Sequence, residues 1–216
     1  KGVPHYAVFT NSDPKTEDVP YDCETMGIGW GLVSGGGVGT PGVTFPAGTA
    51  MTIPGGQHIV FQLHLLNPST KPLYVDPAYI NLVGTHETSL QQVGLLIAGT
   101  LDIAIPAQST GVTVSGGCTL DEPMAHIFDT FPHMHQLGRR ITAAKQTGTS
   151  SPVMLSDQQW NFADQGLYPV EGSADVGDQI TVSCTYDNPN DAPVNFGLST
   201  KDEMCVNVLY YYPATQ

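Results

Sequence analysis

Residues 179–186 read Gln-Ile-Thr-Val-Ser-Cys-Thr-Tyr, in which polar side chains alternate with apolar or aromatic ones. Successive side chains of an extended chain point to opposite faces, so the four larger side chains would share one buried face. These side chains are Ile180, Val182, Cys184 and Tyr186. The stretch therefore predicts a strand with one face in a core and the other in water.

Segments of the same kind recur along the chain, separated by turn residues such as Asn67-Pro68 and Gly116-Gly117. We predict further strands at residues 6–10, 58–66, 79–83, 95–105, 111–114, 125–131, 140–144 and 203–212. The 24 glycines and 17 prolines favour short strands and turns, and no segment predicts a long helix. The pattern indicates an all-β protein with antiparallel β-sandwich architecture, divided near residues 85–95.

Glycine is unusually dense between residues 33 and 41, where Gly35, Gly36 and Gly37 are consecutive and Gly39 follows. Glycine tolerates backbone conformations that other residues avoid and offers no side chain to a core. We therefore predict a surface loop over this segment.

Charge narrows the range of functions. The 216 residues include 20 acidic and 7 basic side chains, a formal net charge of −13. Such a surface repels phosphate backbones and anionic membranes, so we expect neither nucleic acid nor membrane as a partner. It suits a secreted or periplasmic protein that handles a cation. No apolar run reaches the roughly 20 residues that span a bilayer, and we expect that any targeting segment preceding Lys1 has been removed.

The four cysteines contain no Cys-x-x-Cys pair, which argues against a zinc ribbon or a thioredoxin-like motif. Cys184 and Cys205 each lie on an alternating run, and a disulfide could join them if the two strands are neighbours. The alternative is two buried free thiols. The remaining pair, Cys23 and Cys118, could be bonded to each other or stay reduced.

The most distinctive local motif is Pro-His-Met-His-Gln-Leu-Gly at residues 132–138. On a strand, His133 and His135 would project from one face with Cα atoms about 6.5–7 Å apart. Two imidazoles at that spacing can bind one transition-metal ion and leave positions for a third protein ligand and for solvent. The alternative is a pair of polar strand histidines without a metal.

A second group of histidines lies at residues 58–64. His58 and His64 are roughly 20 Å apart along a strand, too far to share one ion. Either could bind a metal with partners from elsewhere in the chain, and for His58 we favour a hydrogen-bonded strand histidine.

Several blocks together resemble a known family. They are residues 177–186, the Asp-Glu-Met-Cys-Val-Asn run at 202–207, Tyr-Tyr-Tyr-Pro at 210–213, the histidine motif at 133–138, Gln-Leu-His at 62–64 and Gly-Leu-Tyr-Pro-Val-Glu at 166–171. In this order they resemble the copper type II ascorbate-dependent monooxygenases, which include dopamine β-hydroxylase and peptidylglycine α-hydroxylating monooxygenase. The resemblance covers nearly the whole chain.

The resemblance implies two jelly-roll-like β-sandwich domains that face a cleft, with one copper in each. A shortened electron-transfer domain would span residues 1–90, and the oxygen-activating domain residues 91–216. His133, His135 and Met204 would form the catalytic copper site. A thioether favours Cu(I), the state that reacts with oxygen. The family also implies a Cys184–Cys205 disulfide beside Met204.

The second copper site departs from the family pattern. The resemblance assigns His64 to it, together with an adjacent histidine pair that is reduced here to His5-Tyr6. A two-histidine site should hold copper less well, so we expect one strong site and one weakened site. Phe131 and Val208 stand where the peptide-amidating branch has Arg and Tyr, which implies an apolar or small substrate instead of a peptide carboxylate.

We therefore predict a copper-dependent monooxygenase that hydroxylates a C–H bond with O2 and an external reductant such as ascorbate. The main alternative is a non-catalytic copper-binding or storage protein that retains the single His-His-Met site. A third possibility is a structural β-sandwich with incidental histidines.

Overall fold

The computed structural model describes residues 5–12, 29–37, 41–65, 67, 69–72, 74 and 78–215, and these form strands, turns and irregular segments without a helix. The strands are β1 (His5–Asn11), β2 (Gly31–Gly37), β3 (Thr49–Ala50), β4 (His58–Leu63), β5 (Gln91–Gln92), β6 (Gly94–Thr100), β7 (Ala104–Ile105), β8 (Ser109–Thr119), β9 (Met124–His133), β10 (Gly138–Gln146), β11 (Val153–Gln159), β12 (Tyr168–Ala174), β13 (Gln179–Asn188), β14 (Val194–Asn195) and β15 (Cys205–Tyr212). The all-β prediction is confirmed. Within these ranges, no helix is long and apolar enough to cross a membrane.

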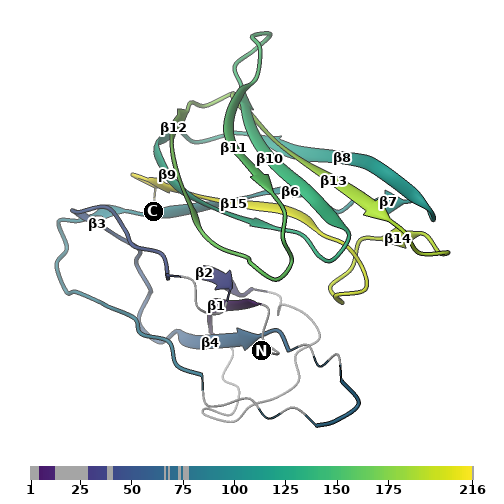
Figure 1. Ribbon diagram of the computed structural model, residues 1–216. Helices are drawn as coiled ribbons and strands as arrows, with labels where there is room; N and C mark the ends of the chain where they lie inside the picture. Colours follow the sequence, from purple (N-terminus) through teal and green to yellow (C-terminus); the bar gives the residue numbers. More distant parts are fainter. Residues whose placement is uncertain are drawn as a thin grey trace.

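Two four-stranded antiparallel sheets form a β-sandwich, as Figure 1 shows. One sheet has the order β11-β10-β13-β8 and the other the order β12-β9-β15-β6. The strand predicted at 179–186 is β13, and its burial alternates from Gln179 to Asn188. It lies between β8 and β10, so both of its backbone edges are hydrogen-bonded. The strand with one buried face that the alternation predicted is therefore confirmed.

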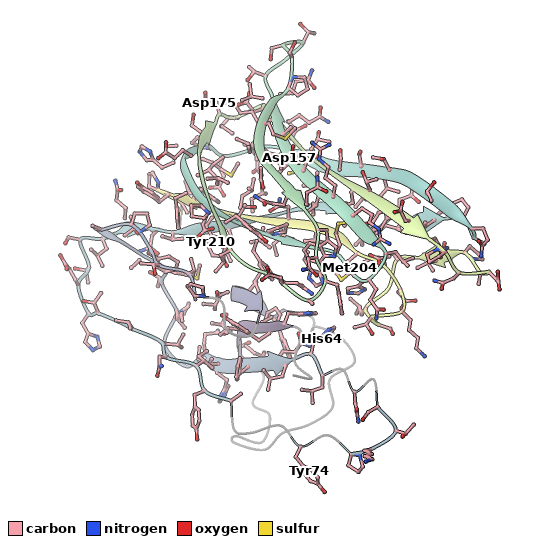
Figure 2. The ribbon with its side chains drawn as sticks, in the orientation of Figure 1. His64, Tyr74, Asp157, Asp175, Met204 and Tyr210 are labelled. Carbon is pink, nitrogen blue, oxygen red and sulfur yellow. A yellow bond between two sulfur atoms is a disulfide. The ribbon has the colours of Figure 1, made fainter. Side chains whose placement is uncertain are left out.

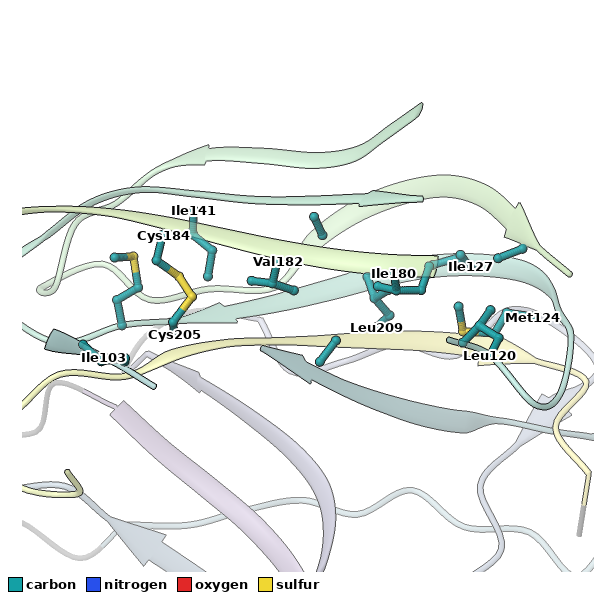
Figure 3. Close-up of a cluster of buried hydrophobic side chains, with 14 of the residues drawn as sticks. Ile103, Leu120, Met124, Ile127, Ile141, Ile180, Val182, Cys184, Cys205 and Leu209 are labelled. Atoms are coloured by element: carbon teal, nitrogen blue, oxygen red, sulfur yellow. A yellow bond between two sulfur atoms is a disulfide. The ribbon is translucent and has the colours of Figure 1, made fainter. Parts of the chain in front are cut away.

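The sandwich core contains a disulfide, shown in Figure 3. Cys184 of β13 and Cys205 of β15 are bonded, with Cα atoms 5.8 Å apart, and both are fully buried. The two strands belong to different sheets. The bond therefore joins the two layers across the core, and the Cys184–Cys205 disulfide that the resemblance implied is confirmed. Cys118 carries a free thiol, and Cys23 lies outside the described residues.

A third layer lies below the sandwich in Figure 1. It is a three-stranded antiparallel sheet in the order β2-β1-β4. The sheet β12-β9-β15-β6 is covered on both faces. Leu209 of β15 packs in the sandwich core, whereas Val208 packs with Phe131, and Leu32 of the third layer joins that second cluster. The strands of the sandwich lie within residues 91–216, and the division into domains at residue 90 remains a prediction.

The glycine-rich segment is a strand, which corrects the predicted loop. Residues 31–37 form β2 beside β1, and positions 33–37 are buried. A Cβ on Gly35 would lie 2.7 Å from Cε1 of Phe131, closer than real Cβ contacts. The glycines are therefore present because β2 packs directly against the sandwich, a reason that composition alone does not reveal. Residues 38–40 of the predicted loop lie outside the described residues.

Replacing Gly35 by alanine should destabilise the protein by about 1–2 kcal/mol, because the added methyl group overpacks the contact with Phe131. Thermal unfolding would measure the loss. Gly42→Ala is the matched control, because nothing lies within 4 Å of a Cβ at that position. Equal unfolding temperatures for the two variants would contradict the close contact of β2.

Other strand predictions differ from the structure, and the strand predicted at 95–105 is divided into β6 and β7. Residues 79–83 have strand-like composition but are irregular, with Tyr79 83% and Val83 100% exposed. A strand needs a ladder partner and a buried face as well as suitable residues. Conversely, β11 and β12 were not predicted. Both lie at sheet edges, where polar residues and Pro169 are tolerated.

Candidate metal centre

The two histidines of the motif at 132–138 lie together at one end of the sandwich. His133 is the last residue of β9, and His135 lies in the connection to β10, so the two histidines are not on one continuous strand. Their ring centroids are 5.2 Å apart and the rings are nearly perpendicular, at 86°. His135 is fully buried.

Hydrogen bonds determine which ring nitrogen of His133 is available. Gln165 is fully buried, and its Nε2 donates to the carbonyl of Phe162 at 3.0 Å. Its Oε1 therefore faces Nδ1 of His133, also at 3.0 Å. An amide oxygen can only accept, so His133 carries its proton on Nδ1 and keeps the lone pair on Nε2.

His135 has the same arrangement. Its Nδ1 lies 3.0 Å from the carbonyl oxygen of Asp202, which can only accept, so Nδ1 donates. The Nε2 of His135 is buried without a hydrogen-bond partner. A buried lone pair without a partner is costly unless something binds it. Both histidines thus offer Nε2 as the available nitrogen, and an acceptor fixes each ring, as at metal sites.

Met204 lies immediately before β15 and is half-buried. Its carbonyl accepts a hydrogen bond from the Tyr186 hydroxyl at 2.7 Å, and its N–H donates to the Glu203 carboxylate at 3.3 Å. The same carboxylate accepts the N–H of His135 at 2.9 Å. Figure 2 shows Met204 on the sandwich and His64 on the sheet below it.

The third layer brings a second pair of histidines to the site. The β1–β4 ladder continues past Leu63, because the N–H of His64 donates to the carbonyl of His5 at 3.0 Å. His5 and His64 are therefore cross-strand neighbours, and their ring centroids lie 4.1 Å apart. The Nδ1 atoms of both rings are buried without a partner. The sequence assigned these two histidines to one site, and the structure places them together.

Tyr6, which occupies the position of the missing histidine, does not join this pair. Its ring packs edge-on against Phe61, with centroids 5.8 Å apart. Burial raises the pKa of its hydroxyl, which disfavours the phenolate form that a metal would need.

The two histidine pairs are in contact with each other. His5 lies 4.9 Å from His133 between ring centroids, which connects His64, His5, His133 and His135 in one row. Across the described part of the chain, no three His, Cys, Asp or Glu side chains are arranged to hold one metal ion. The four histidines therefore do not form one shared site. A ligand set of two histidines and one methionine contains only two residues of these four types, so it would not be found as a group of three.

Burial keeps these histidines neutral. It lowers the pKa of His5 to about 2, with further lowering from His133 and the other two rings. The pKa of His133 is lowered to about 3, mainly by burial and further by the nearby His135 ring. The hydrogen bond to Gln165 raises this pKa in part. Burial lowers the pKa of His64 and of His135 as well. Only neutral imidazole binds a metal, so the cluster is in its ligand form at neutral pH.

Two apolar side chains lie close to His133 on the sandwich strands β9 and β15. Phe131 and Val208 face each other across β9 and β15, and both are buried. The Phe131 ring stacks on His133 at 6.3 Å. The two positions that the resemblance associates with substrate are therefore buried hydrocarbon beside His133.

Residues 91–216 match the family described as copper type II ascorbate-dependent monooxygenase, C-terminal domain. This segment is more than half of the chain. The chain belongs to this family.

Full-length relatives of this copper monooxygenase family align over most of the chain. DBH-like monooxygenase protein 1 of Mus musculus is 25% identical over 220 residues, which cover 93% of this chain and 35% of the relative. Dopamine beta-hydroxylase of Bos taurus is 27% identical over 231 residues, covering 99% and 37%. Tyramine beta-hydroxylase of Caenorhabditis briggsae is 24% identical, covering 95% and 37%. The chain thus spans about a third of the length of these curated relatives.

Two residues of the candidate site were missed from the sequence. Gln165 fixes the His133 ring, and Glu203 accepts backbone N–H groups beside Met204. Both are fully buried polar side chains. An acidic residue directly before the predicted ligand Met204, at the start of a largely apolar predicted strand, is a sequence signal that could have indicated Glu203. No local pattern around Gln165 indicates that it would reach His133.

Proposed function

We propose that this chain is a copper-dependent monooxygenase module that hydroxylates a C–H bond of an apolar or small substrate. One atom of O2 would enter the C–H bond and the other would leave as water. An external reductant such as ascorbate would supply the two electrons, and two protons would come from solvent. His133, His135 and Met204 are the proposed ligands of the catalytic copper.

One observation carries the proposal. The buried Nε2 of His135 has no partner, the backbone N–H groups of His135 and Met204 reach the same carboxylate, and the family is one of copper enzymes. Two imidazoles and a thioether suit copper, because soft sulfur stabilises Cu(I) and imidazole accepts either oxidation state. Bound copper would supply the one-electron redox chemistry that activation of O2 requires.

The chain's own residues prepare this site in three ways. Gln165 and the Asp202 carbonyl hold the ring protons on Nδ1, so Nε2 stays free at both histidines. Burial keeps the rings neutral. Phe131 and Val208 are buried hydrocarbon next to His133 and keep water away from that side of the ring.

We assign His5 and His64 to electron entry. The contact between the His5 and His133 rings gives electrons a short path toward the catalytic ligands. The covalent bond between Cys184 and Cys205 fits an oxidising compartment, so we propose a secreted or periplasmic location.

A second candidate is a non-catalytic copper-binding or storage protein with the His133, His135 and Met204 site alone. The packing of Tyr6 against Phe61 favours it, because only two histidines remain for the second copper. The two candidates differ in the number of copper ions and in ascorbate-dependent uptake of O2.

Anaerobic Cu(I) titration of the wild type, Met204→Ala and His64→Ala tests the proposal. A monooxygenase should bind two ions, with a different one lost in each variant, and should take up O2 with ascorbate and an apolar substrate. One ion that is lost in Met204→Ala and kept in His64→Ala would favour the storage protein. Absence of Cu(I) binding to the wild type would refute both candidates.

A further inference from the structure

Glu203 is a fully buried acid between two segments that carry proposed copper ligands. Its backbone is fixed by the end of β14 and the segment just after it, since its N–H donates to the carbonyl of Asn195 at 3.0 Å and its carbonyl accepts from the N–H of Gly197 at 3.2 Å. These two hydrogen bonds fix the main chain from which the Glu203 side chain extends. It is directed at the connection between β9 and β10, which contains His135.

Three backbone N–H groups donate to this carboxylate. Oε2 accepts from His135 at 2.9 Å and from Met204 at 3.3 Å. Oε1 accepts from Leu137 at 2.6 Å. Residues 134–137 lie outside the strands β9 and β10, so the carboxylate replaces ladder partners for the N–H groups of His135 and Leu137.

We propose that Glu203 is a positioning residue that sets the distance between His135 and Met204, an inference that rests on the proposed copper site. The two ligands are far apart in sequence and belong to separate segments. One oxygen atom accepts the N–H of both, so neither backbone can shift without breaking a bond to the same carboxylate. Rigid support of this kind determines whether a ligand set holds its metal tightly.

The chemistry of the head group explains why an acid is needed. All three partners are donors, and a carboxylate offers acceptors on both oxygens. Glutamine has the same shape but only one acceptor oxygen. Whichever way its amide is oriented, at least one N–H faces an NH2 group and loses its bond. Glu203→Gln therefore removes acceptor capacity without creating a cavity.

Other contacts keep the connection folded when this one is lost. The Trp160 indole donates to the carbonyl of His135 at 2.8 Å, and Asp187 donates its N–H to the carbonyl of Leu137 at 3.0 Å. These two bonds fix the carbonyl groups of His135 and Leu137, and neither involves Met204. Loss of the carboxylate should loosen the geometry between His135 and Met204 and leave the sandwich intact.

The first test uses the metal-free protein and hydrogen exchange. In the wild type, the amides of His135 and Leu137 should be protected, and Glu203→Gln should speed exchange of at least one of them by roughly tenfold or more. Glu122→Gln is the matched control. Glu122 accepts the Tyr211 hydroxyl at 2.9 Å toward the other end of β15, and its substitution should leave these amides unchanged. Unprotected amides in the wild type would overturn the proposal without any variant.

The second test measures copper. Glu203→Gln should weaken Cu(I) binding about 10–100-fold and reduce the Cu–S signal of Met204 in X-ray absorption, while Glu122→Gln should match the wild type. An unchanged affinity and Cu–S signal in Glu203→Gln would overturn the positioning role. If the wild type itself binds no Cu(I), the proposed function fails, and the positioning role that rests on it fails too; protected amides would then show only that Glu203 supports the fold.

Discussion

Replacing His133 by alanine is expected to weaken Cu(I) binding by at least about 100-fold, because loss of a ligand should cost more than the 10–100-fold typical of residues that only support one. His133 presents a neutral imidazole whose Nδ1 is held by Gln165 and whose Nε2 is the available nitrogen. Alanine leaves one imidazole and the Met204 thioether, too few ligands for tight binding. Competition with a Cu(I) chelator under anaerobic conditions would measure the change.

The control for this variant lies on the same strand. His126 of β9 is exposed, stacks on Tyr212 at 4.8 Å between ring centroids, and is not part of the histidine row. His126→Ala should therefore leave the Cu(I) affinity within error of the wild type. Equal losses in the two variants would mean that Cu(I) binds histidines non-specifically, and no loss in His133→Ala would remove His133 from the site.

Local sequence patterns predicted much of the sandwich because its signals are local. Alternation along β13 needs only the two-residue period of an extended chain and one buried face. The segment at 31–37 failed for a reason outside its own sequence. Gly35 leaves room for the ring of Phe131, about a hundred residues away, and composition carries no record of such a contact.

The candidate site was predictable to a similar degree. The His-x-His spacing indicated that His133 and His135 could act together, and family resemblance was needed to connect Met204 with them. The contact between His5 and His133 depends on how the third layer packs on the sandwich. That packing is set by many weak apolar contacts between distant segments, and neither histidine carries a sequence signal for it.

Acid should destabilise the metal-free protein through His5 in particular. Its pKa is lowered to about 2 in the folded state, against 6.5 for the ordinary side chain. Below pH 6.5 His5 is therefore protonated in the unfolded chain but stays neutral in the folded protein. Stability is lost as the pH falls from 6.5 toward 2, and at pH 4.5 the loss from this residue is on the order of 2–3 kcal/mol.

The double comparison of His5→Gln with the wild type at pH 7 and pH 4.5 separates this effect from titrating groups that do not contact His5, since those groups act on both proteins and cancel. Glutamine cannot take up the proton, so the variant should gain about 2–3 kcal/mol relative to the wild type on acidification. Urea unfolding would measure it, and His126→Gln controls for the removal of an exposed histidine. A difference between His5→Gln and the wild type that does not change with pH would mean that His5 is not enclosed between the third layer and the sandwich. The contact with His133, and the electron path proposed through it, would then be lost as well.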